Sequence, residues 1–258
     1  MKLKVIAYAR NGHTDKFGIP RQSREESPIL TRIVFEPEYS VAEALRGIEG
    51  FSHLWLIWGF SENTTTTGKN QHGTGTKPVQ DSDEASETWS PTVRPPRLGG
   101  NKRMGVFATR SPFRPNPVGL SSVKLVGVVK SRKSNVESSS LELIVSGADL
   151  LDGTPIYDIK PYLSFSDCHE EAKNGFADDA KDYRLEVVGL PSPPNCLRDE
   201  SVPIPSSVLK DIAYILSQDP RPAYQDDPNR EYKLDYSGYT VTFVVQDRQA
   251  IVKNIEKM

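Results

Sequence analysis

The sequence predicts a mainly β fold, a sandwich or a barrel, followed by a small α+β lobe. Three observations lead to this prediction. Residues 1–165 hold many short apolar or alternating segments and hardly any helical pattern, which is typical of antiparallel β folds. The clearest amphipathic helix lies much later, at residues 205–218. No P-loop and no strand-linked GxGxxG motif occurs, which disfavours a doubly wound nucleotide-binding sheet.

The first elements are read from residue spacing. Residues 3–9 alternate apolar and polar side chains, as a half-buried strand does, and Ile29–Phe35 is a second strand candidate. Val41–Ile48 is expected to form a short helix, with Ser40 as N-cap and Glu43 completing a capping box. Phe51–Phe60 is aromatic and apolar, which predicts a buried strand.

Residues 61–90 change character abruptly. The segment SENTTTTGKNQHGTGTKPVQDSDEASETWS has almost no apolar side chains, so it cannot bury enough surface to offset the entropy of ordering. We expect a flexible insert between two strands.

Further strands are expected at Met104–Thr109, Ser121–Val129, Leu141–Val145 and Asp158–Leu163, with a Ser-rich connection at Ser131–Ser140. The later chain should hold a strand at Leu185–Val188, the helix at Pro205–Gln218, and a hairpin of Tyr239–Val245 and Ala250–Ile255 that turns at Asp247 and Arg248. We therefore divide the chain into a β domain at residues 1–170 and an α+β lobe at residues 171–258.

Composition narrows the class of protein. The net charge is −2, so bulk charge does not indicate a nucleic-acid partner. Cys168 and Cys196 form no CxxC motif, and no metal-ligand spacing is present, so we expect neither a disulfide framework nor a metal site. No signal peptide or membrane span is expected, which favours a cytoplasmic protein. His13 lies in a polar segment without an evident partner, and His53 is expected to be a satisfied, half-buried histidine.

The local charge pattern differs from the bulk charge. Between Thr88 and Val136 there are ten Lys or Arg residues and no Asp or Glu. Such a zone on an otherwise acidic protein is typical of an anion-binding surface, although a solvated basic face is the alternative.

Two motifs concentrate polar chemistry. A loop containing Pro112, Pro115 and Pro117 carries Arg110 and Arg114, and its stiffness favours a functional platform over the alternative of a structural turn. Residues 147–163, GADLLDGTPIYDIKPYL, are rich in carboxylates, which accept hydroxyl and ammonium protons. Turn formation is the alternative role for the first two carboxylates of this segment.

Several motifs together resemble one family. The segment PTVRPPRLGGNKRMGVFATRSPFRPNPVGLSSV at residues 91–123 is similar to the signature of the TsaA-like (YaeB/TrmO) proteins. The elements PRQS at 20–23, FSHLW at 51–55, LLDGTPIYDIKPYL at 150–163 and DPRPAY at 219–224 also match this family. The insert at 61–90 is a departure, since it is longer than we expect in bacterial relatives.

The resemblance implies a single-sheeted closed β-barrel that binds S-adenosylmethionine without a Rossmann fold. It further implies methyl transfer to N6 of threonylcarbamoyladenosine at position 37, in the anticodon stem-loop of threonine tRNA, by a homodimer. By motif, the cofactor-binding residues would be Pro20, Arg21, Gln22, Ser61, Glu62, Arg110, Leu120, Asp149, Leu150, Leu151 and Asp152. Relatives often carry His–Gln where this chain has Ser61 and Glu62.

The chemistry of this reaction suggests further roles. In the modified base N6 belongs to a urea, so a base or a nearby cation that favours the anion would assist methyl transfer. We expect Arg114 or Arg110 to act as the cation or to hold the threonyl carboxylate by a bidentate contact, and Asp158 or Tyr162 to remove the proton. RNA phosphates are expected to contact Arg94, Arg97, Lys102 and Arg103, and RNA bases to stack on Arg221 and Tyr224.

Two alternatives remain open on the sequence. The chain can be a non-catalytic barrel that binds RNA and senses S-adenosylmethionine, or a methyltransferase with another acceptor. The helix stop and turn formed by DPRPAY is likewise an alternative to a stacking surface.

Overall fold

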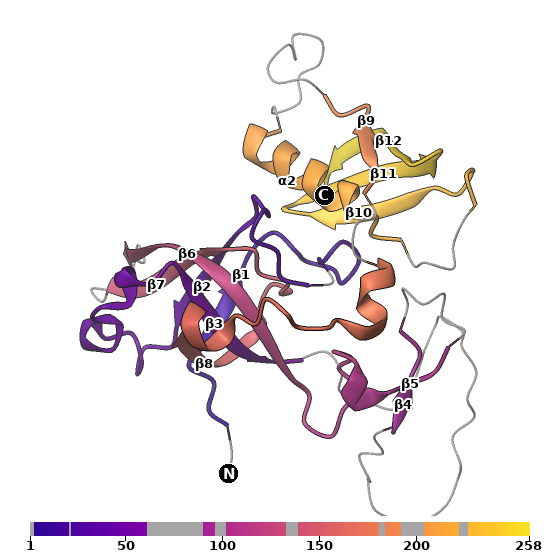
Figure 1. Cartoon of the computed structure of the whole chain (residues 1–258). Coiled ribbons are helices and arrows are strands. Elements are labelled where there is room, and N and C mark those ends of the chain that lie inside the picture. The colour runs from indigo at the N-terminus through magenta and orange to yellow at the C-terminus, as the bar shows by residue number, and fades with distance from the viewer. Residues whose placement is uncertain are drawn as a thin grey trace, which may run out of the picture.

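The computed structural model describes residues 3–20, 22–60, 90–95, 102–132, 139–180, 184–191, 204–221 and 227–258. Within these residues the fold is mainly β, as predicted. Figure 1 shows a barrel with a second sheet and a helix to one side of it, and a small two-stranded ribbon.

Six strands form the barrel, in the order β1-β2-β7-β6-β3-β8. Each pair of neighbouring strands is antiparallel, and the barrel closes because β8 hydrogen-bonds to β1 as well as to β3. Closure leaves these six strands without a free sheet edge. The strands are β1 (Ala7–Arg10), β2 (Leu30–Phe35), β3 (His53–Gly59), β6 (Val118–Arg132), β7 (Ser139–Ser146) and β8 (Pro155–Pro161).

The barrel interior is a packed apolar core. Side chains alternate in and out along each strand, so one face of every strand fills the barrel. In β3, Leu54, Leu56 and Trp58 are buried, whereas Trp55 and Ile57 are only partly buried. The prediction of a strand here is confirmed, but only one of its faces is fully buried. The core also contains Ala7, Ala9, Ile33, Phe35, Val123, Leu143, Val145, Ala148, Leu150 and Ile156.

The helix predicted at Val41–Ile48 is wrong. Two short 3-10 helices replace it, η1 (Ala42–Leu45) and η2 (Ile48–Gly50), and Gly47 between them has a φ of 88°. A left-handed residue cannot continue a helix. Ser40 does not cap η1, since its Oγ accepts the backbone N–H of Leu141 at 2.7 Å instead.

A small ribbon precedes β6. It consists of β4 (Thr92–Val93) and β5 (Met104–Gly105), and a 3-10 turn, η4 (Val106–Ala108), follows at once. The strand expected at Met104–Thr109 is therefore much shorter than predicted. Most of the predicted insert, residues 61–89, and residues 133–138 of the Ser-rich connection lie outside the described residues.

The C-terminal lobe pairs a four-stranded sheet with one long helix. The sheet order is β10-β11-β12-β9, antiparallel except that β9 runs parallel to β12. The predicted hairpin is confirmed, and its turn residues Asp247 and Arg248 have φ values of 46° and 66°. The elements are β9 (Glu186–Val188), α2 (Ser206–Ser217), β10 (Tyr232–Tyr236), β11 (Tyr239–Gln246) and β12 (Gln249–Lys257), reached through α1 (Ser164–Asp167) and η5 (Gly175–Ala180).

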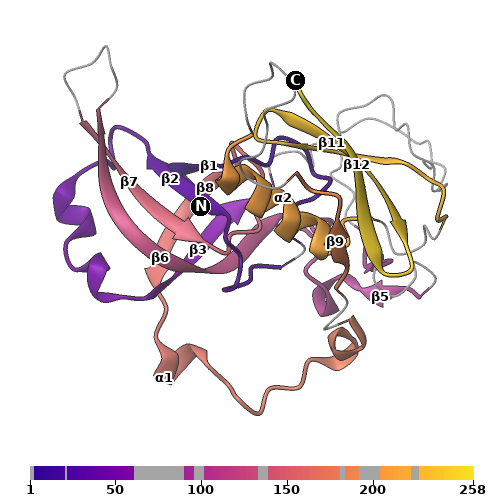
Figure 2. The same cartoon turned by 90° about the horizontal axis from the view of Figure 1, so that it is seen from above.

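The core of the C-terminal lobe includes residues from the N-terminal segment. Ile29 is buried in the cluster formed by α2 and the C-terminal sheet, and Phe17 packs against it. The backbone N–H of Ser237 donates to Gly12 O at 2.9 Å. Figure 2 shows the β1–β2 connection running beside this lobe. The segment between β1 and β2 therefore joins the two parts of the molecule.

Among the described residues, none of the helices has the length and apolar character needed to cross a membrane.

Candidate cofactor and RNA site

Three segments that are distant in sequence meet at one place beside the barrel. Gln22 lies between β1 and β2, Arg110 follows η4, and Asp149 follows β7. Arg110 Nη1 donates a hydrogen bond to Gln22 Oε1, across 88 residues of sequence. Asp149 accepts a hydrogen bond from the backbone of Ser23 and is attracted by the Arg110 guanidinium. The structure thus brings together three of the side chains predicted to bind the cofactor.

Asp149 is held in one orientation by a short relay of side chains. Trp58 Nε1 donates to Ser121 Oγ at 2.9 Å, and Ser121 Oγ donates to Asp149 Oδ1 at 2.5 Å. Burial raises the pKa of Asp149, while the hydrogen bond from Ser121 and the charge of Arg110 act in the opposite direction. Because these hydrogen bonds hold the carboxylate of Asp149, its remaining lone pairs point in a fixed direction and can accept further hydrogen bonds.

Gly119 sets the position of the indole in this relay. Gly119 pairs with Trp58 across β3 and β6, and a Cβ at residue 119 would lie 2.3 Å from the Trp58 ring. Only glycine lets the ring lie flat against β6 at this point. Neither Trp58 nor Ser121 was predicted as a site residue. Ser121 faces inward on β6, two residues after Gly119, and Trp58 faces inward on the neighbouring strand β3.

The segment Leu150–Asp152 is divided between different surroundings. The Leu150 side chain packs in the barrel core, so the predicted contact of Leu150 with a cofactor would have to be made by its backbone. Asp152 Oδ1 accepts the backbone N–H of Asn11 at 3.0 Å, and its Oδ2 accepts from Arg10 Nη1 at 3.3 Å. Leu151 is half-buried, and its carbonyl oxygen accepts the Thr154 hydroxyl at 2.8 Å.

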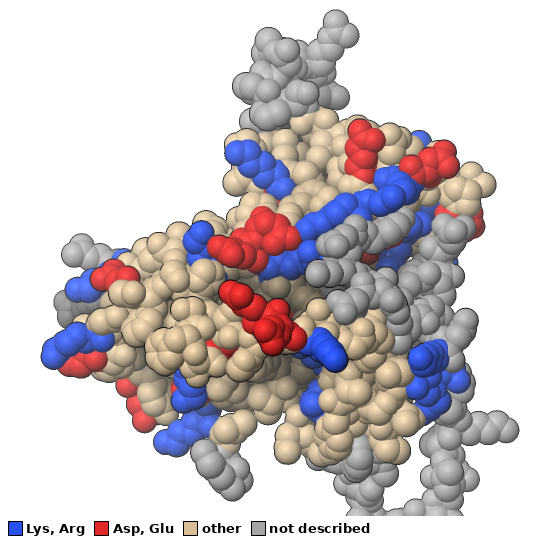
Figure 3. Space-filling model, viewed as in Figure 1, with Lys and Arg blue, Asp and Glu red and all other residues tan. Residues whose placement is uncertain are grey.

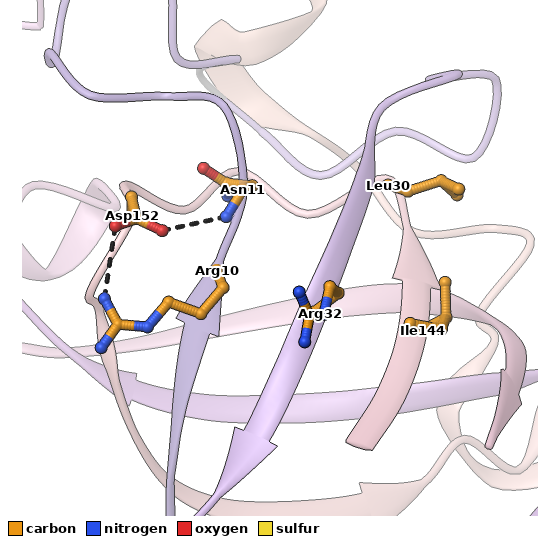
Figure 4. Close-up of a pocket in the computed structure, with 6 residues that line it drawn as sticks. All are labelled: Arg10, Asn11, Leu30, Arg32, Ile144 and Asp152. Carbon is orange, nitrogen blue, oxygen red and sulfur yellow. Dashed lines mark hydrogen bonds and ion pairs between the residues drawn. The ribbon is translucent and has the colours of Figure 1, made fainter. Parts of the chain in front are cut away.

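Asp152 lines a pocket on the outer face of the barrel. Figure 4 shows its carboxylate between Arg10 and Asn11, with Arg32 on the neighbouring strand. This shallow pocket has a volume of about 380 Å³ and is lined by Arg10, Asn11, Leu30, Arg32, Ile144 and Asp152. Among the described residues, neither Asp149 nor its partners Ser121, Ser23 and Arg110 line this pocket.

The other predicted cofactor residues are placed as follows. Pro20 is buried, and Leu120 is exposed on the outer face of β6, where it pairs with Ile57. Three predicted residues, Arg21, Ser61 and Glu62, lie outside the described residues.

Asp158 lies two strands away from Leu120. Ile57 pairs with Leu120 on one side and with Asp158 on the other, so the two Cα atoms are about 10 Å apart. Asp158 forms an ion pair with Lys160 at 3.0 Å and accepts the backbone N–H of Ile159 at 2.9 Å. It is therefore near the predicted site but already carries two partners.

Tyr162 is separated from this group. Its backbone N–H donates to His53 O at the start of β3, and its ring packs against His53 and Trp55, with centroid distances of 6.1 and 5.5 Å. Trp58 is at the other end of that strand. Desolvation and the neighbouring Cys168 and Asp167 raise the pKa of Tyr162, which disfavours its role as a base at neutral pH.

Arg114 holds the proline-rich loop from within. Its Nη1 donates to Thr109 O at 3.1 Å and to Ser111 O at 3.3 Å, and its guanidinium lies 6.0 Å from the centre of the Phe107 ring. These contacts favour the structural alternative for this side chain over the predicted catalytic role.

The predicted RNA contacts differ in exposure. Arg94, Lys102 and Arg103 are exposed, and Arg103 also donates to Thr92 Oγ1 at 2.7 Å. Figure 3 shows Lys and Arg, but no Asp or Glu, over the described surface of the β4–β5 ribbon on the visible face. Two further predicted contacts, Arg97 and Tyr224, lie outside the described residues.

Arg221 does not fit its predicted role as a stacking surface for RNA. Its side chain is 7% exposed and donates from Nε and Nη2 to the two oxygens of Asp219, at 2.8 and 3.0 Å. This pair fixes the turn after α2, as the alternative reading of DPRPAY predicts.

His13 and His53 have different surroundings. His53 is half-buried, with Nδ1 2.9 Å from Ser52 Oγ, as expected. His13 is buried, although the sequence around it is polar. Its ring packs edge-on against that of Tyr236, with the ring centroids 5.1 Å apart. Neither ring nitrogen of His13 has a hydrogen-bond partner among the described residues.

Comparison with known proteins places these features in a family. Residues 8–168 match the model of the tRNA-methyltransferase O N-terminal domain, and residues 193–258 match the TrmO C-terminal domain. A tRNA (adenine(37)-N6)-methyltransferase of Eikenella corrodens is 41% identical over 80% of this chain and 97% of its own length.

Two further matches, both from Pseudomonas aeruginosa, extend the comparison. A putative S-adenosylmethionine-dependent methyltransferase, RcsF, is 36% identical over 88% of this chain and 85% of its own. The crystal structure of TrmO from this organism superposes with a TM-score of 0.67 and 27% identity, over 99% of this chain and 98% of that one. The chain belongs to the tRNA-methyltransferase O (TrmO) family.

Proposed function

We propose that this protein is an S-adenosylmethionine-dependent methyltransferase that modifies N6 of adenosine 37 in tRNA. Family membership over both parts of the chain supports this activity. The observation that carries it is the meeting of Gln22, Arg110 and Asp149, which come from three distant segments. Gln22 and Arg110 are exposed, so packing in a core does not explain why these side chains meet.

The chemistry of these residues fits the cofactor. Asp149 is an oriented carboxylate that can accept from ribose hydroxyls or an ammonium group, and Arg110 can bind a carboxylate with two parallel hydrogen bonds. Leu120 offers an exposed apolar side chain on β6, the strand that also carries Ser121. When bound, S-adenosylmethionine supplies an electrophilic methyl group on a sulfonium. The protein then has to hold the acceptor nitrogen in line and exclude water.

The finer proposal is that the acceptor is N6 of threonylcarbamoyladenosine in the anticodon stem-loop of threonine tRNA. The resemblance supports this substrate, and its chemistry assigns tasks to residues. N6 of a urea is a weak nucleophile with a relatively acidic N–H, so a cation near it assists the reaction. Arg110 takes this role rather than Arg114, because the Arg114 guanidinium already donates to two loop carbonyls.

Asp158 is the base in this proposal. It lies on β8 beside the strand pair that carries Leu120, and its carboxylate retains lone pairs beyond those used by Ile159 and Lys160. Tyr162 is set aside, because it lies at the far end of β3. Full activity in Asp158→Asn would exclude Asp158 as the base.

The same proposal includes a homodimer, which the family resemblance implies, located in the cytoplasm and built from a barrel domain at 1–170 and a lobe at 171–258.

The decisive test is methyl transfer to defined tRNA. The protein is incubated with labelled S-adenosylmethionine and threonine tRNA that either bears or lacks the threonylcarbamoyl group, and the digested nucleosides are analysed by mass spectrometry. We expect a methyl gain confined to the modified nucleoside.

Asp149→Asn serves as the matched variant in this assay. It should weaken cofactor binding by calorimetry and lower turnover in parallel, because it removes the oriented carboxylate. Absence of methylation on both tRNAs, with cofactor binding intact in the unchanged protein, would refute this acceptor and leave the S-adenosylmethionine-sensing RNA-binding barrel or a methyltransferase with a different acceptor.

A further inference from the structure

Two large aromatic side chains are exposed in and just before the proline-rich loop, Phe113 on the loop and Phe107 on η4. Phe107 is 70% exposed and Phe113 is 60% exposed, and Arg110 lies between them in sequence. Exposed phenylalanines lose the stabilisation that burial gives and often mark an interaction site. The two phenylalanines flank Arg110, a residue of the candidate site, so we ask whether they bind the substrate.

The loop that carries Phe113 is rigid without any partner molecule. Arg114 donates to the carbonyl oxygens of Thr109 and Ser111, and the backbone N–H of Phe113 donates to Ser111 Oγ at 3.3 Å. The neighbouring prolines further restrict the backbone. An aromatic ring on such a loop binds at a low cost in conformational entropy.

The charge around these rings selects the kind of partner. The sequence from Thr88 to Val136 contains no acidic residue, and Lys102, Arg103 and Arg110 are exposed near the rings in the chain. Figure 3 shows the same bias on the surface over the β4–β5 ribbon. Aromatic rings within a cationic surface are the combination that binds unpaired nucleotides by stacking and by phosphate attraction.

A second copy of the chain fits this surface less well. In a two-fold interface through Phe113 the same patch would meet itself, which would bring two sets of basic side chains together. Such like-charge contact opposes association. An RNA strand neutralises the same charges.

We propose that Phe113, with Phe107 six residues before it in the chain, is the stacking surface for an unpaired base of the RNA substrate, next to the acceptor nucleotide whose N6 lies by Arg110. Three residues span at most about 11 Å, so a base on Phe113 lies within reach of a neighbouring nucleotide at Arg110. This role replaces the stacking expected of Arg221, which is buried. The inference rests on the proposed function.

The test measures RNA binding without turnover. The probe is an anticodon stem-loop oligonucleotide of threonine tRNA sequence, with 2-aminopurine placed in turn at each unpaired position beside adenosine 37. The variants are Phe113→Ala, Phe113→Trp and Phe165→Ala, the last a matched control because Phe165 is 86% exposed on α1. Cofactor affinity and sedimentation are measured on each variant.

Stacking contributes about 1–3 kcal/mol per base, so Phe113→Ala should raise the Kd for RNA about 5- to 150-fold. It should also remove the fluorescence quenching at one 2-aminopurine position. We expect Phe113→Trp to restore both, and Phe165→Ala, cofactor affinity and sedimentation to be unchanged. Methyl transfer by Phe113→Ala should show a raised KM for RNA with a similar kcat.

Two results would overturn the inference. One is a loss of RNA affinity in Phe113→Ala no larger than in Phe165→Ala. The other is a smaller species in sedimentation, which would make Phe113 a contact between copies. If the unchanged protein methylates no RNA, yet Phe113→Ala alone loses binding and quenching, the proposed reaction fails and the stacking surface stands.

Discussion

Replacing His13 by phenylalanine tests the energetics of the junction between the barrel and the C-terminal sheet. His13 is fully buried, its ring packs edge-on against Tyr236, and burial lowers its pKa from the ordinary 6.5 to about 4. The folded protein therefore holds a neutral imidazole over a pH range in which the unfolded chain binds a proton.

The sign and size of the effect follow from this difference in pKa. Because the folded pKa is lowered, the unfolded state binds more protons below pH 6.5, so stability is complete above that value and is lost as the pH falls towards 4. For pKa values of 6.5 and about 4, the loss is about 2 kcal/mol between pH 7 and pH 5. It reaches about 3 kcal/mol at pH 4.

The assay is urea unfolding at half-unit steps from pH 7 to pH 4.5, in parallel for the unchanged protein and His13→Phe. Phenylalanine keeps a ring beside Tyr236 but cannot titrate. We expect the variant to lack the acid loss assigned to His13, so that the difference in unfolding free energy grows by about 2 kcal/mol from pH 7 to pH 5. Parallel pH curves for the two proteins would refute this account of the junction.

Three further substitutions separate structural from direct roles. Gly119→Ala places a Cβ against the Trp58 ring, so we expect about 1–3 kcal/mol of destabilisation and a changed tryptophan emission. Unchanged stability and emission would show that the ring adjusts freely. Arg114→Ala removes two charged hydrogen bonds to loop carbonyls, so unfolding in urea should show a loss of about 1–3 kcal/mol, whereas lost activity at unchanged stability would restore a catalytic role. Arg221→Ala leaves the partly buried Asp219 without its cation and should cost about 2–4 kcal/mol with unchanged affinity for RNA, and a selective loss of that affinity would contradict the burial argument.

The strands were predictable wherever a simple alternation of buried and exposed side chains governs the chain. Leu54, Leu56 and Trp58 show this in β3, and the C-terminal hairpin follows the same rule. The strand β10 also alternates, with Tyr232, Leu234 and Tyr236 inward, but the run is short and has charged residues between. This strand was not predictable from the local pattern.

The candidate site was predictable in its members but not in their surroundings. Gln22, Arg110 and Asp149 were selected by motif and do meet. The burial of Leu150 depends on how the chain enters the barrel core after β7, which no local pattern reveals. The pairing of Arg221 depends on the left-handed conformation of Asp219, which turns the carboxylate back to the guanidinium.

The segment between β1 and β2 has a consequence for the whole molecule. Its residue Ile29 completes the C-terminal core, while Gln22, a few residues earlier, contacts Arg110 in the candidate site. Docking of the C-terminal lobe and ordering of the β1–β2 segment at the candidate site are therefore expected to be linked equilibria, in which each strengthens the other by the same factor. A chain shortened to the barrel alone would leave Ile29 in water. The segment between β1 and β2 would then keep its contact with Arg110 but lose its contact with the C-terminal core. Under the proposed function, the C-terminal lobe would therefore act on the cofactor site through the β1–β2 segment that it anchors, at a distance from the chemistry itself.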